Sequence, residues 1–187
     1  MEITIRRPNL EALTKDKIPR DFYEVMAYFN HALSVPVLER TDHWRYMPRQ
    51  RPITKDEIRD LWVPSFNTNI TFLAELPKRG IIGSASVIVS KDSTAYEHRD
   101  SRGPNTLAMS VAQGYSYSEI CEKMIRLIEA DLTLINIQAI TTTPVEFKEE
   151  IRLMEETLRK KGEPLSDWQP AKQIGLSGKA LTYTISS

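Results

Sequence analysis

The chain has 187 residues and carries 25 Lys and Arg residues against 25 Asp and Glu residues, so its formal net charge at pH 7 is zero. This length suits one domain with a substantial core, and the balanced charge excludes a strong overall field for nucleic acid or membrane surfaces. No apolar run reaches the roughly 18 residues that span a bilayer, and the N-terminus lacks the pattern of a secretory signal. We therefore expect a single cytoplasmic domain over residues 1–187.

The first third of the chain predicts a strand and two helices. Residues 3–5 alternate between apolar and polar side chains, which is typical of a short strand. Residues 19–33 place their apolar side chains on one helical face, and the proline at the start suits a first turn. After an irregular stretch at residues 41–52, Thr54 and Glu57 have the spacing of a capping box and are expected to begin a short helix.

Two β-rich runs follow, at Ile70–Leu76 and Ile81–Val89. The four residues between them, Pro77–Gly80, are prone to form a turn, so these segments predict a β-hairpin. Residues 90–105 are polar and are expected to form a loop that leads into the next strand.

The most informative segment of the sequence predicts a strand, a tight turn and an amphipathic helix. The strand spans Thr106–Val111, and the turn contains Gln113 and Gly114. Ser116 and Glu119 have capping-box spacing at the start of the helix. Four apolar residues then recur at helical spacing and are expected to face the core: Ile120, Met124, Leu127 and Ile128.

The last third predicts a strand at residues 135–140, a helix from a capping box at Thr143 to a glycine stop at Gly162, and a final strand at residues 179–185. Helices that alternate with strands in this way connect strands of one sheet. The complete order is β-α-α-β-β-β-α-β-α-β. We therefore predict a mixed α/β fold with a mostly antiparallel central sheet that is flanked by helices.

A glycine turn between a strand and a helix N-terminus suits a phosphate. The first N–H groups of a helix have no partner within the helix, and the helix dipole makes this end positive. Many strand–turn–helix units only pack, however. The local pattern alone therefore fits both a packing role and an anion-binding role.

The order of elements, the hairpin and the turn after the fourth strand resemble the GCN5-related N-acetyltransferase (GNAT) superfamily. In that family the turn after the fourth strand, at the start of the third helix, holds the pyrophosphate of acetyl-CoA. The family signature is Arg/Gln-x-x-Gly-x-Gly/Ala, and the aligned residues here read Gln113-Gly114-Tyr115-Ser116-Tyr117-Ser118. Serines thus occupy the two places at which glycine is usual. Leu158 stands where the family often carries the tyrosine that protonates the departing thiolate.

The resemblance implies an acetyl-CoA-dependent N-acetyltransferase that transfers the acetyl group directly to a primary amine of a small molecule or peptide. It also implies which residues bind acetyl-CoA. Val111 would offer its backbone, and the other candidates are Gln113, Gly114, Tyr115, Ser116 and Ser118. Dimers are frequent in the family, so a homodimer is compatible with the resemblance.

Three residues are candidates for the base that removes a proton from the amine. Glu97 and His98 lie in the polar loop before the fourth strand, and histidine titrates in the useful range with an ordinary pKa of about 6.5. Glu75 lies at a strand end beside the hairpin turn. Two of the three have a structural alternative, which is a solvated loop side chain for His98 and a solvated or ion-paired carboxylate for Glu75. The histidines are widely separated, with no partner at metal-ligand spacing, so we expect no metal site.

Two other features have both a structural and a functional interpretation. Cys121, the single cysteine, lies beside apolar helix positions, which favours a packed thiol over a nucleophile. Residues 43–55 hold four basic side chains and no acidic one, interleaved with Trp44 and Tyr46. This pattern favours a solvated basic loop with buried aromatics over recognition of an acidic substrate, and nucleic acid binding would need a broader basic face.

Two further functions remain open. The first is a weak or inactive GNAT-like protein that binds acyl-CoA or a protein partner as a sensor or scaffold. The serines in the turn and Leu158 favour this alternative. The second is a small α/β module outside the family that binds a phosphate or nucleotide, which only the glycine turn supports.

Overall fold

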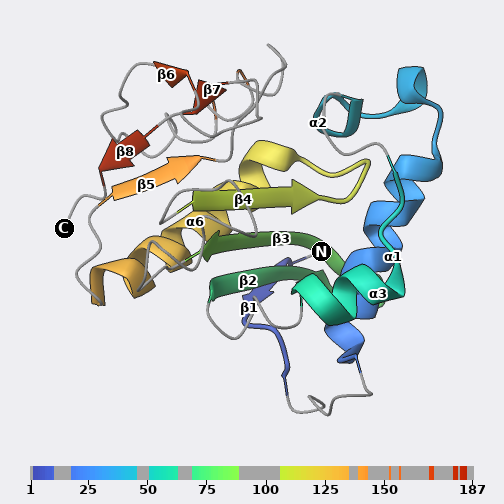
Figure 1. The fold of residues 1–187 in the computed structure, drawn as a ribbon, viewed down its shortest axis with the longest axis horizontal. Coiled ribbons are helices and arrows are strands. Elements are labelled where there is room, and N and C mark those ends of the chain that lie inside the picture. Colours follow the sequence, from blue (N-terminus) through green and yellow to red (C-terminus); the bar gives the residue numbers. More distant parts are fainter. Residues whose placement is uncertain are drawn as a thin grey trace.

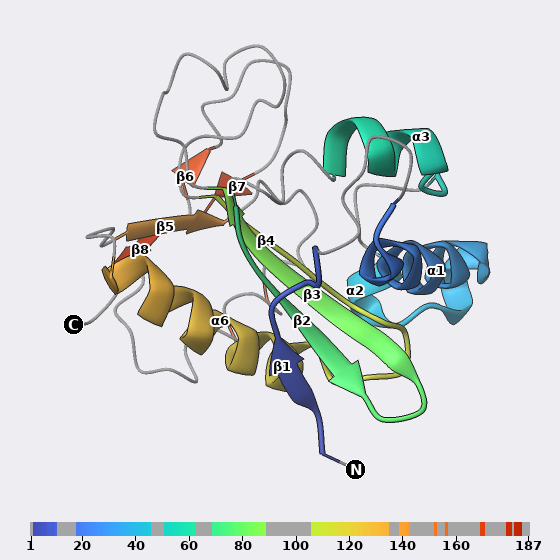
Figure 2. The ribbon, with the colours of Figure 1, turned by 90° about the horizontal axis from the view of Figure 1, so that it is seen from below.

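The computed structural model describes residues 2–10, 18–45, 51–62, 69–88, 106–134, 139–142, 152, 156, 169–170, 179–180 and 182–184. The main sheet contains β1 (Thr4–Arg6), β2 (Asn69–Leu76), β3 (Gly80–Ile88), β4 (Thr106–Val111), β5 (Ala139–Thr142) and β8 (Thr182–Thr184), paired in this order. Only β4 and β5 run parallel among these pairs. Two helices, α1 (Arg20–Ser34) and α6 (Tyr117–Leu134), cover opposite faces of the sheet (Figures 1 and 2). The mixed, mostly antiparallel α/β fold predicted from the sequence is therefore confirmed.

The helix α1 confirms the prediction for residues 19–33 and supplies most of one core. Pro19 stands at the N-cap position, directly before the first helical residue. The apolar residues that α1 buries share one face: Phe22, Val25, Tyr28, Phe29, Ala32 and Leu33. They pack with Leu73 and Ile81 from the sheet. Each fully buried Val, Leu, Ile or Phe side chain stabilises the fold by about 1.5–3 kcal/mol, because its apolar surface is removed from water.

The helix α6 forms the second core on the opposite face, where it packs against β2, β3 and β4. Its largest fully buried side chains are Ile120, Met124, Ile125, Ile128 and Leu132. The prediction that Leu127 faces this core is wrong, since this residue is 39% exposed. At about 100° per residue, position 127 falls beside the stripe that runs through positions 121, 124, 125 and 128.

The strands β2 and β3 form the predicted hairpin, and its turn depends on Gly80. This residue has a φ of 79°, in the region that favours glycine. The carboxylate of Glu24 in α1 accepts a hydrogen bond from the backbone N–H of Ile81 at 3.1 Å. A Cβ atom on Gly80 would lie 2.7 Å from Oε2 of Glu24. The backbone conformation therefore favours glycine here, and a side chain would also displace the carboxylate of Glu24.

The described start of the stretch at residues 41–52 is less irregular than the sequence predicts. After the 3₁₀ turn η1 (Val37–Glu39), a single helical turn, α2 (Asp42–Arg45), places Trp44 in the core with no exposed surface. Four residues are too few to show a helical period, so only the tertiary contact of Trp44 explains this turn. The predicted capping box at Thr54 is confirmed, and α3 (Lys55–Glu57) continues directly into a π-helical segment, η2 (Ile58–Trp62).

The C-terminal third is described only in part. The helix predicted from Thr143 to Gly162 lies outside the described residues except for positions 152 and 156, which are helical. The single strand predicted at residues 179–185 is instead two short strands. β7 (Lys179–Ala180) pairs with β6 (Gln169–Pro170), whereas β8 pairs with β5 at the edge of the main sheet.

Candidate functional site

The candidate site is the connection between β4 and α6. The backbone N–H of Tyr115 donates to the carbonyl of Ala112 at 3.3 Å and so closes a tight turn over Gln113 and Gly114. Gly114 has a φ of 88°. No heavy atom of the described residues lies within 4 Å of a Cβ atom built on Gly114, so the space in front of this residue is open. The turn therefore combines the backbone freedom of glycine with an accessible surface.

The N-terminus of α6 follows directly after the turn. The hydroxyl of Ser116 accepts a hydrogen bond from the backbone N–H of Glu119 at 3.4 Å, which confirms Ser116 as a helix cap. The carbonyl of Ser116 accepts the first helical bond, from Ile120 at 3.2 Å. An 18-residue helix has a substantial dipole, and its positive end points at this turn. No Lys or Arg stands between Arg102 and Lys123 in the sequence, so the turn itself offers an anion backbone donors and the helix dipole but no basic side chain.

The residues predicted to bind the cofactor differ in their exposure. Gly114 and Ser116 are exposed, and Gln113 and Tyr115 are half-buried. Ser118 lies in the first turn of α6 and is only 8% exposed. The side-chain oxygen of Gln113 is buried without a hydrogen-bond partner in the described part of the chain. Because a carboxamide carries donors as well as an acceptor, Gln113 suits a polar ligand at this turn.

Val111, the last residue of β4, has its backbone carbonyl already occupied. The indole Nε1–H of Trp44 donates to the carbonyl oxygen of Val111 at 2.5 Å. The family resemblance implies that the backbone of Val111 faces the cofactor. It does not predict the hydrogen bond from Trp44 to Val111. The only signal was the aromatic character of residue 44 within a basic segment.

A second contact between α1 and the sheet involves three hydroxyl groups. The hydroxyl of Tyr28 lies 2.6 Å from that of Ser110 and 2.9 Å from that of Ser84, and the two serine hydroxyls are 2.9 Å apart. Burial raises the pKa of Tyr28 to about 12, although the serine hydroxyls oppose this shift. The phenol is therefore protonated at neutral pH and connects α1 to β3 and β4. No sequence motif predicts this cluster, because its members come from three elements.

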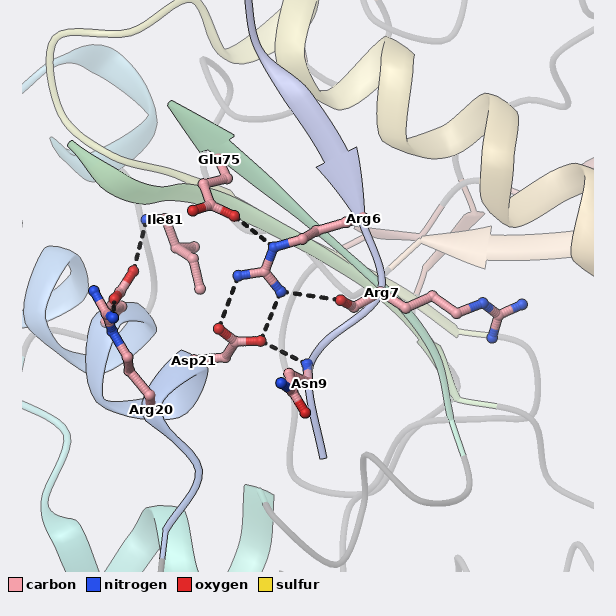
Figure 3. Close-up of polar contacts among 8 residues, drawn as sticks. Arg6, Arg7, Asn9, Arg20, Asp21, Glu75 and Ile81 are labelled. Carbon is pink, nitrogen blue, oxygen red and sulfur yellow. Dashed lines mark hydrogen bonds and ion pairs between the residues drawn. The ribbon is translucent and has the colours of Figure 1, made fainter. Parts of the chain in front are cut away.

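Glu75, one of the three predicted bases, belongs to an ion-pair network (Figure 3). Nε of Arg6 donates to Glu75, and the two terminal nitrogens of Arg6 donate to Asp21 at 2.7 and 2.8 Å. The ion-paired alternative given for Glu75 is therefore what the structure shows. Glu97 and His98 lie outside the described residues.

This network lines a cavity of about 640 Å³ at the hairpin end of the sheet. Its lining residues are Arg6, Arg7, Asn9, Pro19, Arg20, Asp21, Glu24 and Glu75. Arg20 pairs with Glu24, and Arg7 pairs with Asp131. Because its charged side chains bond to residues of the protein, this cavity is a weaker candidate site than the β4–α6 turn.

Cys121 and the basic segment have structural roles. Cys121 is fully buried beside Tyr117, and burial raises the pKa of its thiol. A buried, protonated thiol is a poor nucleophile. Arg51 pairs with Glu57, and Arg45 donates to the carbonyls of Leu38 and Arg40. Burial of Trp44 agrees with the structural interpretation, and Tyr46 and Arg49 lie outside the described residues.

The described residues contain neither a metal-binding cluster nor a membrane-spanning helix. No group of three or more His, Cys, Asp or Glu side chains within the described ranges is placed to hold a metal ion. Likewise, none of the helices in the described part of the chain is long and apolar enough to cross a membrane.

Solved structures with the same fold span almost the entire chain. A GNAT-family acetyltransferase from Staphylococcus aureus aligns with a TM-score of 0.62 and 13% identity, over 99% of this chain and 100% of that one. The fold is that of the GNAT acetyltransferases. A GNAT phosphinothricin acetyltransferase from Sinorhizobium meliloti in complex with acetyl-CoA aligns with a TM-score of 0.60 and 12% identity, over 100% and 90% of the two chains.

A third GNAT-fold structure is an enzyme named for an amine substrate. The spermidine N-acetyltransferase chimera that includes the Vibrio cholerae protein aligns with a TM-score of 0.56 and 16% identity, over 99% and 95% of the two chains. The sequence itself matches no family model and no curated protein. The predicted resemblance to the GNAT superfamily is therefore confirmed at the level of the fold.

Proposed function

We propose that this protein is an acetyl-CoA-dependent N-acetyltransferase that transfers an acetyl group directly to a primary amine of a small molecule or peptide. The observation that carries this proposal is the β4–turn–α6 unit. Its open glycine turn leads into a helix N-terminus, within a fold shared over its full length with acetyltransferases that include an acetyl-CoA complex. The acceptor, a possible homodimer and a cytoplasmic location belong to the same proposal, as does a single domain over residues 1–187.

The turn residues divide the binding of acetyl-CoA among them. The backbone at Gly114 and the cap at Ser116 face the open side and would receive the pyrophosphate. Gln113 would use its buried carboxamide, and Tyr115 would form a wall of the turn because it packs against the α6 core. Ser118 and the backbone of Val111 complete the proposed set. Binding without a Lys or Arg at the turn relies on the helix dipole and on neutral donors.

Transfer would proceed without an acyl-enzyme, because Cys121 is buried and protonated at neutral pH. Bound acetyl-CoA supplies the thioester carbonyl that an amine attacks. The protein has to hold the two reactants together and to accept a proton from the ammonium form of the acceptor. Glu97 and His98 remain our proposed bases. Glu75 is the weakest of the three candidates, because a base must give up its ion pair with Arg6.

A second function, a weak or inactive acyl-CoA-binding protein, is favoured by two observations at the same turn. The carbonyl of Val111 is occupied by Trp44, and Glu119 places a negative charge in the first turn of α6. A carboxylate at that position competes with a phosphate for the helix dipole. This alternative keeps the cofactor but predicts little or no transfer to amines.

The first experiment is isothermal titration of acetyl-CoA and CoA into the protein, with ADP and ATP as controls. We expect micromolar binding of both CoA species and much weaker binding of the nucleotides. ADP and ATP offer the turn a pyrophosphate but lack the arm of CoA, so they make only part of the contacts. Release of free thiol from acetyl-CoA in the presence of an amine panel then separates an enzyme from a binding protein. Absence of heat with either CoA species would contradict both functions.

A further inference from the structure

The contact between Trp44 and Val111 has a consequence for the binding of an extended ligand along β4. The backbone N–H of Ala112 donates to Ile82 in β3 at 2.6 Å. In an antiparallel pair, successive residues direct their peptide groups to opposite sides. The carbonyl of Val111 therefore points away from β3, toward the edge of β4 where β5 pairs with Thr106 and Leu107.

Trp44 thus occupies the hydrogen-bonding edge of β4 immediately before the Gly114 turn. The indole ring is fully buried and makes edge contacts with Phe29 at 4.7 Å and with Tyr28 at 6.3 Å between ring centroids. Its nitrogen lies 2.5 Å from the carbonyl oxygen of Val111, so the ring also fills the space beside that oxygen.

The element that carries Trp44 is a single short turn of helix. The helix α2 is one turn of four residues, and an isolated helix of that length has no stability of its own in water. Side-chain contacts therefore hold α2 in place, and the bond from Trp44 to Val111 is one of them. Displacing the indole also breaks its ring contacts with Phe29 and Tyr28 of α1, so the exchange costs packing as well as one hydrogen bond.

We propose that Trp44 is a latch on β4, which holds the carbonyl of Val111 until an amide-bearing arm such as that of CoA replaces the indole. This inference rests on the proposed function, because it takes CoA as the ligand. The Trp44 N–H and an arm N–H compete for one acceptor, and the indole ring competes for the same space. The latch therefore weakens CoA binding and couples it to movement of α2.

The test compares CoA affinities of the unmodified protein and a Trp44→Phe variant by calorimetry. Phenylalanine retains an aromatic ring against Phe29 but has no N–H group. We expect CoA to bind about three- to tenfold more tightly to the variant, the factor that corresponds to removal of one competing hydrogen bond. Thermal unfolding of both proteins in the absence of CoA verifies that the variant is folded.

Tyr28→Phe is the matched control. It removes a hydroxyl that bonds the side chain of Ser110, the residue before Val111, and leaves the Trp44 contact in place. We expect its CoA affinity to equal that of the unmodified protein. If the Trp44→Phe variant binds CoA with the same affinity as the unmodified protein, the latch is overturned and the proposed function stands. If both variants bind CoA more tightly, the latch is also overturned, because the effect is then not specific to Trp44. Absence of CoA binding in all three proteins overturns the proposed function and the latch together.

A fluorescence measurement tests the latch without altering Trp44. The chain has three tryptophans, so a Trp62→Phe, Trp168→Phe protein retains Trp44 alone. We expect saturating CoA to shift the emission of Trp44 to longer wavelength, because the indole leaves its buried site, whereas ADP has no such effect. Unchanged emission at saturating CoA overturns the latch. This result does not depend on whether the Trp44→Phe variant folds, because the protein measured here retains Trp44.

Discussion

Gly80 and Gly114 both have a positive φ, but their surroundings give them different roles. At Gly80 a Cβ atom would lie 2.7 Å from the carboxylate of Glu24, so a side chain there would displace this carboxylate from its bond to Ile81. At Gly114 a Cβ atom would meet no heavy atom of the described residues within 4 Å. The positive φ explains the glycine at this position, and the open space in front of it is where we propose that a phosphate binds.

At the residue scale we predict that Gly114→Val weakens CoA binding at least about tenfold relative to Gly114→Ala. Both variants adopt the same unfavourable φ, which costs about 1–3 kcal/mol of stability. Only valine adds branches to the space that we assign to the pyrophosphate. Calorimetry gives the affinities, and urea unfolding gives the stabilities. Equal CoA affinity in the two folded variants would place the cofactor elsewhere.

At the scale of elements, one carboxylate joins three segments that are distant in sequence. Asp21 in α1 accepts two hydrogen bonds from Arg6 of β1 and one from the backbone of Asn9, and Arg6 also bonds to Glu75 of β2. Burial by itself raises the pKa of Asp21, but the bonds from Arg6 and Asn9 outweigh burial and lower it. The network therefore stabilises the packing of α1 and β1 on the hairpin only while Asp21 is ionised.

We predict that Asp21→Asn lowers the free energy of unfolding by about 2 kcal/mol at pH 7, the size of hydrogen bonds to a charged group. Because the folded-state pKa of Asp21 lies below its unfolded value of about 3.9, its contribution is present above that value and is lost as pH falls through the folded pKa. Urea unfolding between neutral and acidic pH measures both effects, and the variant should lose less stability on acidification.

Asp60→Asn is the control for Asp21→Asn. Asp60 also pairs with an arginine, Arg59, but its side chain is 58% exposed. Exposed ion pairs contribute little to stability. If the two variants change stability and its pH dependence by equal amounts, the Asp21 network does not hold α1 to the sheet as we infer.

For the whole molecule, the two cores share the strands that lie between them. Leu73 packs under α1, whereas its neighbours Phe72 and Ala74 pack under α6. Alternate residues of one strand point to opposite faces, so the same strands carry both cores. Loss of one core therefore destabilises the strands on which the other core packs. This arrangement supports the proposal that residues 1–187 are one cooperative unit.

We therefore predict a single unfolding transition, which far-ultraviolet circular dichroism and tryptophan fluorescence report at the same urea concentration. Under the proposed function, CoA shifts this transition upward, because a ligand present at 100 times its Kd stabilises the folded state by about 2.7 kcal/mol. Two separated transitions would contradict a single domain. An unaltered transition at saturating CoA would instead count against binding to the folded state.

The sequence by itself determined the elements whose causes are local. The period of α1 and α6, the hairpin around Gly80, and the caps at Thr54 and Ser116 depend on neighbouring residues, and so they could be predicted. The β4–turn–α6 unit, together with the order of the elements, also carried the resemblance to the GNAT superfamily, and solved structures share this fold.

Only the tertiary structure decided which groups meet across elements. The bond of Trp44 to Val111, the hydroxyl cluster of Tyr28 and the pairing of Glu75 with Arg6 each join segments that are tens of residues apart. No local spacing encodes such contacts, because they depend on how α1 and α2 pack on the sheet. The same packing decided that β4 presents an occupied carbonyl beside an open turn.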